Sequence, residues 1–157
     1  MSLNIPKIIT ESENELISLF KDFHENPELG FEEKRTAQII KKKLFEYGVD
    51  HIKSGIGITG VVGVIKGKIN SNRSVGIRAD MDALPIHEKT NLAYSSKING
   101  KMHACGHDAH TTMLLGAAKY LASTRCFKGS AVLIFQPAEE GLGGALKMIS
   151  DLSLIHI

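Results

Sequence analysis

Two short stretches of the sequence concentrate side chains that bind metal ions. Residues 103–110 contain one thiol, three imidazoles and one carboxylate, and residues 136–141 contain the adjacent acids Glu139 and Glu140. Such side chains are usually dispersed over a protein surface, so this density indicates a functional site. Thiolate, imidazole and carboxylate groups are ligands of zinc and of neighbouring divalent ions. The two stretches therefore predict part of a metal site.

The spacing of these residues indicates how they would share the chemistry. Cys105 and His107 are two positions apart, so both side chains can reach one ion from an extended segment. Of two adjacent acids, one can bind metal while the other accepts a proton from water that the metal has made acidic. Two other interpretations stay open. Paired acids also occur at exposed helix starts, and Cys105 with His107 can form a nucleophilic dyad, although no side chain is evident that would orient the imidazole.

A second acidic pair, Asp80 and Asp82, follows a predicted strand. Strand alternation puts Arg78, Asp80 and Asp82 on one face, so two carboxylates approach one point where the strand ends. Carboxylates that lie this close favour a cation beside them. The alternative is an ordinary surface ion pair between Arg78 and an aspartate.

The elements that must position these groups predict an α/β fold, with a mixed and largely parallel sheet flanked by helices. Apolar residues spaced three or four positions apart predict helices over residues 12–24, 32–47, 109–122 and 143–150. Short β-branched runs predict buried strands over residues 56–65, 75–78 and 129–135. The first two strands are expected to form a hairpin, and a parallel crossover through a helix is expected to join the last two. In open α/β sheets ligands bind beyond the carboxyl ends of strands, where all three clusters of chemical groups fall.

Three local features of these elements can also be predicted. The first two helices are expected to cover the sheet. Asp108 is a favoured residue type at a helix N-terminus and is expected to cap the helix over residues 109–122. In the last helix Ala145, Met148 and Ile149 are expected to point inward.

Composition restricts the class of protein and its partners. With 157 residues, 43% hydrophobic and 23% charged, the chain has the balance of one globular domain. A net charge of +2 gives no strong field, and Lys41, Lys42 and Lys43 are typical of a solvated helix face, so no nucleic-acid partner is expected. No apolar run reaches the roughly 18 residues that span a bilayer, and the start lacks a signal-peptide pattern. We expect a cytoplasmic protein with no membrane partner.

Three ordered blocks of the sequence resemble the signature blocks of the M20 metallopeptidase amidohydrolases. The relevant branch holds hippurate hydrolase, N-acyl-amino-acid deacylases and the auxin-conjugate hydrolases. The blocks are residues 78–86, 102–108 and 135–141, and residues 24–29 resemble the N-terminal signature of the family. The resemblance implies an aminoacylase-like, zinc-exopeptidase-like catalytic domain that binds two divalent metal ions per site, which can be zinc, manganese, cobalt or nickel.

The resemblance also implies roles for particular residues. Cys105 would be the bridging metal ligand, His107 and Glu140 further ligands, and Glu139 the general base. Other branches of the family have a His-x-Asp motif in place of residues 80–82, which implies that Asp82 orients the site and that Asp80 fills a position that binds metal elsewhere.

The implied activity is hydrolysis of the amide bond of N-acyl amino acids, including hippurate-like substrates. The substrate would be a small molecule, and the parent protein would be a homodimer or a higher homo-oligomer. Two alternatives are kept: a cysteine-dependent amidase that uses Cys105, and a non-catalytic metal-binding protein.

The family pattern extends further than this sequence does. The resemblance implies two more histidine ligands and a dimerisation domain beyond residue 151. Residues 152–157 equal the translation of a transposon end used as a sequencing adapter. We therefore expect residues 1–151 to be the N-terminal part of a truncated catalytic domain, residues 152–157 to be derived from the adapter, and the fragment by itself to be inactive.

Overall fold

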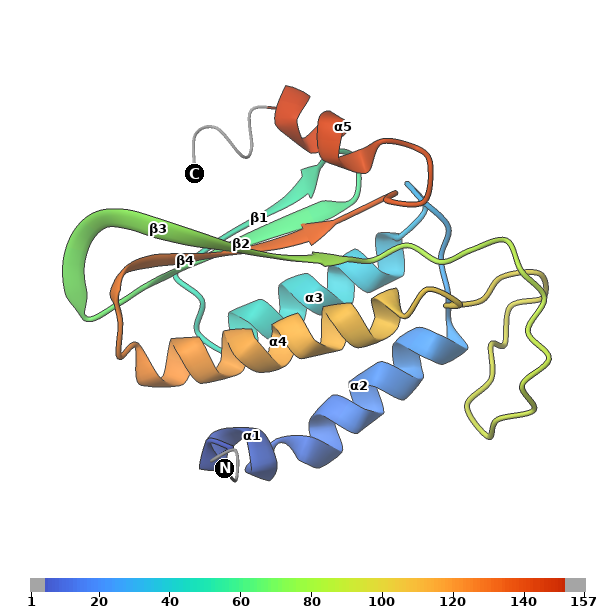
Figure 1. The fold of residues 1–157 in the computed structure, drawn as a ribbon, viewed down its shortest axis with the longest axis horizontal. Helices are drawn as coiled ribbons and strands as arrows, with labels where there is room; N and C mark the ends of the chain where they lie inside the picture. Colours follow the sequence, from blue (N-terminus) through green and yellow to red (C-terminus); the bar gives the residue numbers. More distant parts are fainter. Residues whose placement is uncertain (1–4, 152–157) are drawn as a thin grey trace.

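A four-stranded sheet in the order β1-β2-β4-β3 forms the centre of the molecule (Figure 1). The computed structural model describes residues 5–151, so the expectation for residues 152–157 lies outside the described residues. The elements in chain order are α1 (Lys7–Glu11), α2 (Glu13–Glu25), α3 (Lys34–Glu46), β1 (His51–Ile56), β2 (Gly60–Lys66), β3 (Ile69–Asp80), α4 (His107–Thr124), β4 (Lys128–Gln136) and α5 (Gly144–Ser150).

The sheet is mixed, as predicted. Strand β2 pairs with β1 and with β4 in the antiparallel sense, whereas β3 and β4 are parallel. Helix α4 joins β3 to β4, so the predicted strand-helix-strand crossover is confirmed. This crossover brings the carboxyl ends of β3 and β4 to the same end of the sheet.

The predicted hairpin between residues 56–65 and 75–78 is wrong. The apolar run over residues 56–65 is divided between the end of β1, a turn and β2, so the hairpin is β1-β2. The turn begins at Gly57, whose φ angle of 59° lies in the left-handed region that glycine adopts at little cost, and Ile58 follows with a φ angle of 84°. Strand β4 then lies between β2 and β3.

Helices α3 and α4 pack on one face of the sheet (Figure 1). Helix α2 packs mainly against α4, so the expectation that both N-terminal helices cover the sheet is correct only for α3. The core between these layers includes the fully buried side chains Phe23, Ile40, Leu44, Leu115, Leu133 and Phe135. No helix within residues 5–151 is long and apolar enough to cross a membrane.

Helix α5 lies on the opposite face of the sheet (Figure 1). Met148 is fully buried there, as predicted, against the small apolar cluster of Ile56, Val62 and Val132. Ile149 is 41% exposed, so its predicted inward orientation is wrong. The buried residues of α5, Gly144 and Met148, are four positions apart and share one face, and Ile149 follows Met148 directly, so its side chain points away from that face.

An ion-pair cluster around Glu15 of α2 connects this helix to α3 and to α4. The Glu15 carboxylate accepts hydrogen bonds from Lys43 at 2.9 Å, from Lys119 at 2.7 Å and from the Tyr47 hydroxyl at 2.8 Å. Burial opposes ionisation of Glu15, but the bonds from these three groups lower its pKa to about 2. The cluster therefore stabilises the helical layer that carries α4.

Candidate metal centre

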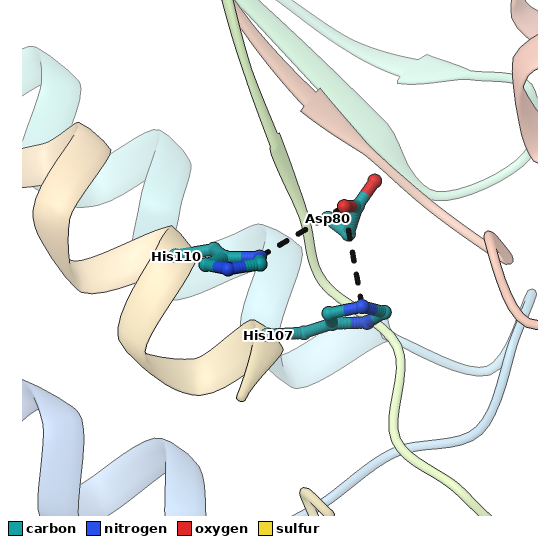
Figure 2. A group of neighbouring side chains, drawn as sticks. All are labelled: Asp80, His107 and His110. Carbon is teal, nitrogen blue, oxygen red and sulfur yellow. Dashed lines mark ion pairs between the residues drawn. The ribbon is translucent and has the colours of Figure 1, made fainter. Parts of the chain in front are cut away.

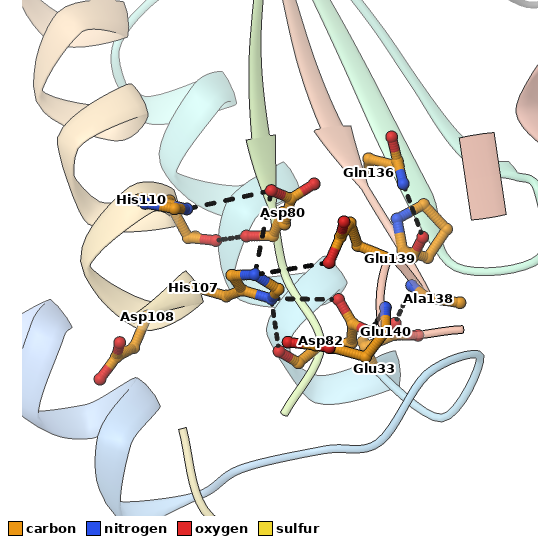
Figure 3. Close-up of polar contacts among 12 residues, drawn as sticks. Glu33, Asp80, Asp82, His107, Asp108, His110, Gln136, Ala138, Glu139 and Glu140 are labelled. Carbon is orange, nitrogen blue, oxygen red and sulfur yellow. Dashed lines mark hydrogen bonds and ion pairs between the residues drawn. The ribbon is translucent and has the colours of Figure 1, made fainter. Parts of the chain in front are cut away.

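The three chemical clusters meet where β3 and β4 end and α4 begins (Figure 3). Asp80, the last residue of β3, is paired in register with Gln136, the last residue of β4. Helix α4 starts at His107, beside both strand ends. The clusters therefore lie beyond the carboxyl ends of the parallel strands, as predicted.

The structure brings together the three side chains predicted to bind metal. One ligand atom each from Cys105, His107 and Glu140 lies within 4.8 Å of the other two. His107 is buried and Glu140 is half-buried, whereas Cys105 is exposed. Gly106, between the two ligands, has a φ angle of 83° that lets the chain turn from the loop into α4. A divalent ion could contact all three groups without a large rearrangement of the backbone.

The predicted capping role of Asp108 is wrong. Gly106 occupies the N-cap position of α4, and Asp108 lies in the first turn of the helix. Its carboxylate accepts a 2.6 Å hydrogen bond from Nδ1 of His24, a buried residue of α2. The other ring nitrogen of His24 lies 3.3 Å from the carboxylate of Glu88. Asp108 therefore fixes the start of α4 to α2 through a side-chain contact with a distant part of the sequence.

Asp82 orients the His107 ring. The Nδ1 atom of His107 lies 2.9 Å from the backbone carbonyl oxygen of Asp82 and 3.2 Å from its Oδ1 atom. Nδ1 is therefore the protonated nitrogen, and Nε2 is left to bind a metal ion. Nε2 lies 3.9 Å from carboxylate oxygens of both Asp80 and Glu139. The Asp82 carboxylate accepts from Nδ1 and raises the pKa of His107 to about 8, although burial opposes protonation of the ring.

The same aspartate holds the two adjacent acids. Asp82 is only 1% exposed, and its Oδ2 accepts a 2.9 Å hydrogen bond from the backbone N–H of Glu140. Burial opposes ionisation of Asp82, but hydrogen bonds from His107 and from the backbone of Glu140 and Glu139 lower its pKa. Asp82 is thus an anion in contact with two of the three candidate ligands. The Glu139 side chain is 42% exposed, so water can reach it.

A second group of potential ligands consists of Asp80, His107 and His110 (Figure 2). Oδ2 of Asp80 lies 3.9 Å from Nε2 of His107 and 3.9 Å from Nδ1 of His110. His110 was not among the predicted site residues, although two histidines three positions apart on a helix share one face. Arg78 pairs with Asp80 and donates a 2.5 Å hydrogen bond from Nε to Oε1 of Gln136, so the Arg-Asp ion pair that was the alternative interpretation of these residues is present.

The charges at this site fit a divalent cation. The carboxylates of Asp80, Asp82 and Glu139 lie 3.9, 3.2 and 3.9 Å from ring nitrogens of His107, and the carboxylate of Glu140 is grouped with His107 and the Cys105 thiol. The hydrogen bond with Glu140 raises the pKa of the Cys105 thiol, and burial and the nearby charges of Glu139 and Asp80 add to this effect. A bound cation would reverse the effect by stabilising the thiolate, which is the form that ligates metal.

Metal affinity is expected to rise steeply with pH. A metal ion must displace a proton from His107, whose pKa is about 8, and from Cys105, whose pKa is raised. Below pH 8 both groups carry their protons, so the apparent affinity should increase by up to about 100-fold per pH unit, and by about 10-fold per unit above pH 8. Competition of the metal-free protein with a coloured zinc chelator between pH 6 and pH 9 measures this slope. An affinity independent of pH would exclude both residues as ligands.

The fold and the site together define a class of protein. A mixed α/β sheet holds thiol, imidazole and carboxylate groups beyond its strand ends, next to a solvent-accessible carboxylate, and these are groups that could bind a metal ion and accept a proton from water. The chain matches Peptidase family M20/M25/M40 over residues 76–156, and it belongs to this family. The family consists of hydrolases that act on amide bonds.

Individual relatives agree with this assignment. The hippurate hydrolase of Campylobacter jejuni is 56% identical over 94% of this chain and 37% of its own length. An IAA-amino acid hydrolase of Arabidopsis thaliana is 49% identical over 85% of this chain and 30% of its own length. The chain thus spans about a third of the length of these curated relatives.

A solved structure shows the same fold. The Bacillus subtilis YXEP protein, described as a dinuclear metal-binding peptidase of the M20 family, is 43% identical to this chain with a TM-score of 0.86. The similarity covers 92% of this chain and 40% of that protein. The predicted fold class and family are therefore confirmed.

Proposed function

We propose that the whole protein hydrolyses the amide bond of N-acyl amino acids, with hippurate-like molecules as substrates. The observation that carries the proposal is the convergence of Cys105, His107 and Glu140 within 4.8 Å of one another, with Glu139 accessible beside them. The relatives named for hydrolysis of hippurate and of an IAA-amino acid support this class of substrate. We further propose a cytoplasmic homo-oligomer.

In this proposal Cys105, His107 and Glu140 hold two divalent ions, with zinc, manganese, cobalt and nickel as the candidates. The Bacillus subtilis relative, described as dinuclear, supports the number of ions. When bound, such ions make water more acidic and polarise the amide carbonyl group. Ligands beyond these three would complete the coordination of both ions.

The protein's own residues would handle the proton and the geometry. Glu139 accepts the proton of the attacking water and then delivers it to the nitrogen of the leaving amine. Asp82 keeps the Nδ1 proton of His107 in place and holds the backbone of Glu140, so that both ligand atoms stay aimed at the same point.

The environment of Cys105 argues against its use as a nucleophile. Catalytic cysteines lie in electropositive surroundings that lower the thiol pKa. Here the surrounding carboxylates raise the pKa of Cys105. At neutral pH the metal-free thiol would therefore be mostly protonated and a weak nucleophile.

Removal of metal is expected to abolish amidase activity. Treatment of the whole protein with a chelator should reduce hydrolysis of benzoylglycine to background, and addition of a divalent ion should restore it, because the attacking water and the amide carbonyl both depend on the metal. The measurement is amine release before and after dialysis against each ion. Activity that survives complete metal removal but is lost on thiol alkylation would favour the cysteine-dependent amidase. Reversible metal binding without hydrolysis of any acyl amino acid in a panel would favour the non-catalytic protein.

A further inference from the structure

Glu33, the residue that precedes α3, is a fully buried carboxylate that reaches the loop carrying the two acids. It is 0% exposed. Its Oε1 accepts a 2.8 Å hydrogen bond from the backbone N–H of Ala138, and its Oε2 accepts a 2.5 Å hydrogen bond from the Thr59 hydroxyl. Residues 137–141 form this segment, the acid loop. Glu33 thus joins the N-terminal part of the chain directly to the acid loop, 105 positions later.

A buried carboxylate with two neutral partners is an unusual feature of a protein core. Glutamate is rarely buried completely unless it is paired with a positive charge. Burial raises the pKa of Glu33, and the nearby charge of Asp82 acts in the same direction, while the bonds from Thr59 and Ala138 offset part of the effect. Burial of a carboxyl group opposes folding unless its oxygens are hydrogen-bonded, so the bonds from Thr59 and Ala138 offset the cost of keeping this side chain in the core.

The contact falls on a residue whose backbone conformation needs support. Ala138 is fully buried and has a φ angle of 49°, in the left-handed region that residues other than glycine rarely adopt. Such conformations persist where surrounding contacts over-determine them. The Glu33 bond holds the Ala138 N–H, and the Ala138 carbonyl accepts a 3.0 Å bond from the backbone N–H of Gly144. The acid loop is therefore fixed at its start.

Asp82 fixes the same loop two residues later. Its Oδ2 accepts the backbone N–H of Glu140, while Glu33 accepts the backbone N–H of Ala138. Glu139 lies between these two anchored positions (Figure 3). Two buried carboxylates from distant parts of the chain thus define the path of the backbone that presents Glu139 and Glu140.

We infer that Glu33 is a positioning residue that sets the placement of Glu139 and Glu140 through the Ala138 amide. The consequence for turnover rests on the proposed function. The expected changes in loop order and metal affinity do not depend on the proposed function, because they concern only the positions of the backbone and of the Glu140 side chain.

The test compares Glu33→Ala with Glu33→Gln in the whole protein. In Glu33→Ala the Ala138 N–H loses its acceptor, whereas in Glu33→Gln the side-chain amide oxygen can still accept that bond and the NH2 group can donate to Thr59. We expect Glu33→Ala to lower kcat by roughly 100-fold, with KM changed less than about threefold, because the base is misplaced while substrate binding is retained. Glu33→Gln should stay within about tenfold of the unmodified protein.

Two measurements that do not depend on activity accompany the kinetics. Hydrogen exchange of the Ala138 amide should accelerate in Glu33→Ala and stay slow in Glu33→Gln. Zinc affinity, measured by chelator competition, should fall in Glu33→Ala by about 10-fold, as for other residues that support metal ligands. Glu15→Ala is the matched control, because it removes a half-buried glutamate that accepts hydrogen bonds from Lys43 and Lys119 in the helical layer, without touching the acid loop.

Each outcome decides one question. The inference is overturned if Glu33→Ala changes no measurement more than Glu15→Ala does. The three measurements are kcat, zinc affinity and hydrogen exchange of the Ala138 amide. If Glu33→Ala does not fold, Glu33→Asp replaces it, because a carboxylate shortened by one methylene cannot reach both partners. If the unmodified protein lacks amidase activity, the proposed function fails, and zinc affinity and amide exchange still decide the role of Glu33.

Discussion

Replacement of Glu139 by glutamine should reduce kcat by about 1000-fold or more while both metal ions stay bound. Glutamine keeps the size and shape of the side chain but cannot accept the proton of the attacking water. Glu139 is 42% exposed, and its Oε2 lies 3.9 Å from Nε2 of His107, close enough to act on a water molecule beside the ligands. The measurement pairs kcat for benzoylglycine with metal content by mass spectrometry.

The neighbouring acid provides a matched control. Glu140→Gln changes the adjacent residue in the same way, but Glu140 belongs to the group of potential ligands with Cys105 and His107. We therefore expect Glu140→Gln to lose metal, and to regain part of its activity at high metal concentration, whereas added metal should not rescue Glu139→Gln. Near-normal turnover by Glu139→Gln would rule out Glu139 as the base, and metal loss from that variant would reverse the two assignments.

Residue type and chain order were sufficient to predict the location of the site. The Cys/His cluster and the acid pair each follow or precede a regular element, and a parallel crossover must bring such positions to one end of a sheet. The structure places Cys105, His107 and Glu140 together, as the sequence predicted. Their roles as ligands, and those of Glu139 and Asp82 in catalysis, stay predictions.

The supporting contacts could not be predicted because they join distant parts of the chain. Glu33 looks like any charged residue at the start of a surface helix, and only the fold shows that it is buried against Ala138. Asp108 fits the pattern of an N-cap, but a contact with His24, 84 positions away, determines its orientation. Local propensity does not include such long-range partners, so it assigns these residues to the surface or to caps.

The predicted hairpin between residues 56–65 and 75–78 was wrong for a related reason. The apolar stretch from Ile56 to Ile65 has the composition of one buried strand, and the turn within it is marked only by Gly57 and by the polar residue Thr59. Residues 69–74 lie between the predicted strands 56–65 and 75–78, yet they extend β3 along an exposed edge of the described sheet. Insertion of β4 between β2 and β3 depends on pairing between strands that are far apart in sequence, which hydrophobic pattern alone does not specify.

Replacement of Asp82 by alanine should weaken metal binding by about 10- to 100-fold and reduce kcat/KM by more than that. Asp82 contacts His107 through both its carbonyl oxygen and its carboxylate, and it accepts the backbone N–H of Glu140. Alanine keeps the carbonyl contact but frees the Glu140 backbone and leaves its part-buried N–H without the Asp82 acceptor. Two ligands therefore lose support in one substitution, and Glu139 moves with Glu140. Unchanged zinc affinity in a folded Asp82→Ala protein would contradict this role.

Asp82→Asn separates the charge of Asp82 from its shape. The asparagine oxygen can still accept the Glu140 N–H, so the acid loop should keep its path, but the negative charge that raises the pKa of His107 to about 8 is lost. The pKa of His107, followed by NMR in the metal-free protein, should fall toward its ordinary value of about 6.5. A proton would then compete less well with the metal, so the steep rise of zinc affinity should move to lower pH by the same amount as the His107 pKa. A fall in the His107 pKa without a matching shift in the affinity profile would show that His107 does not bind the metal.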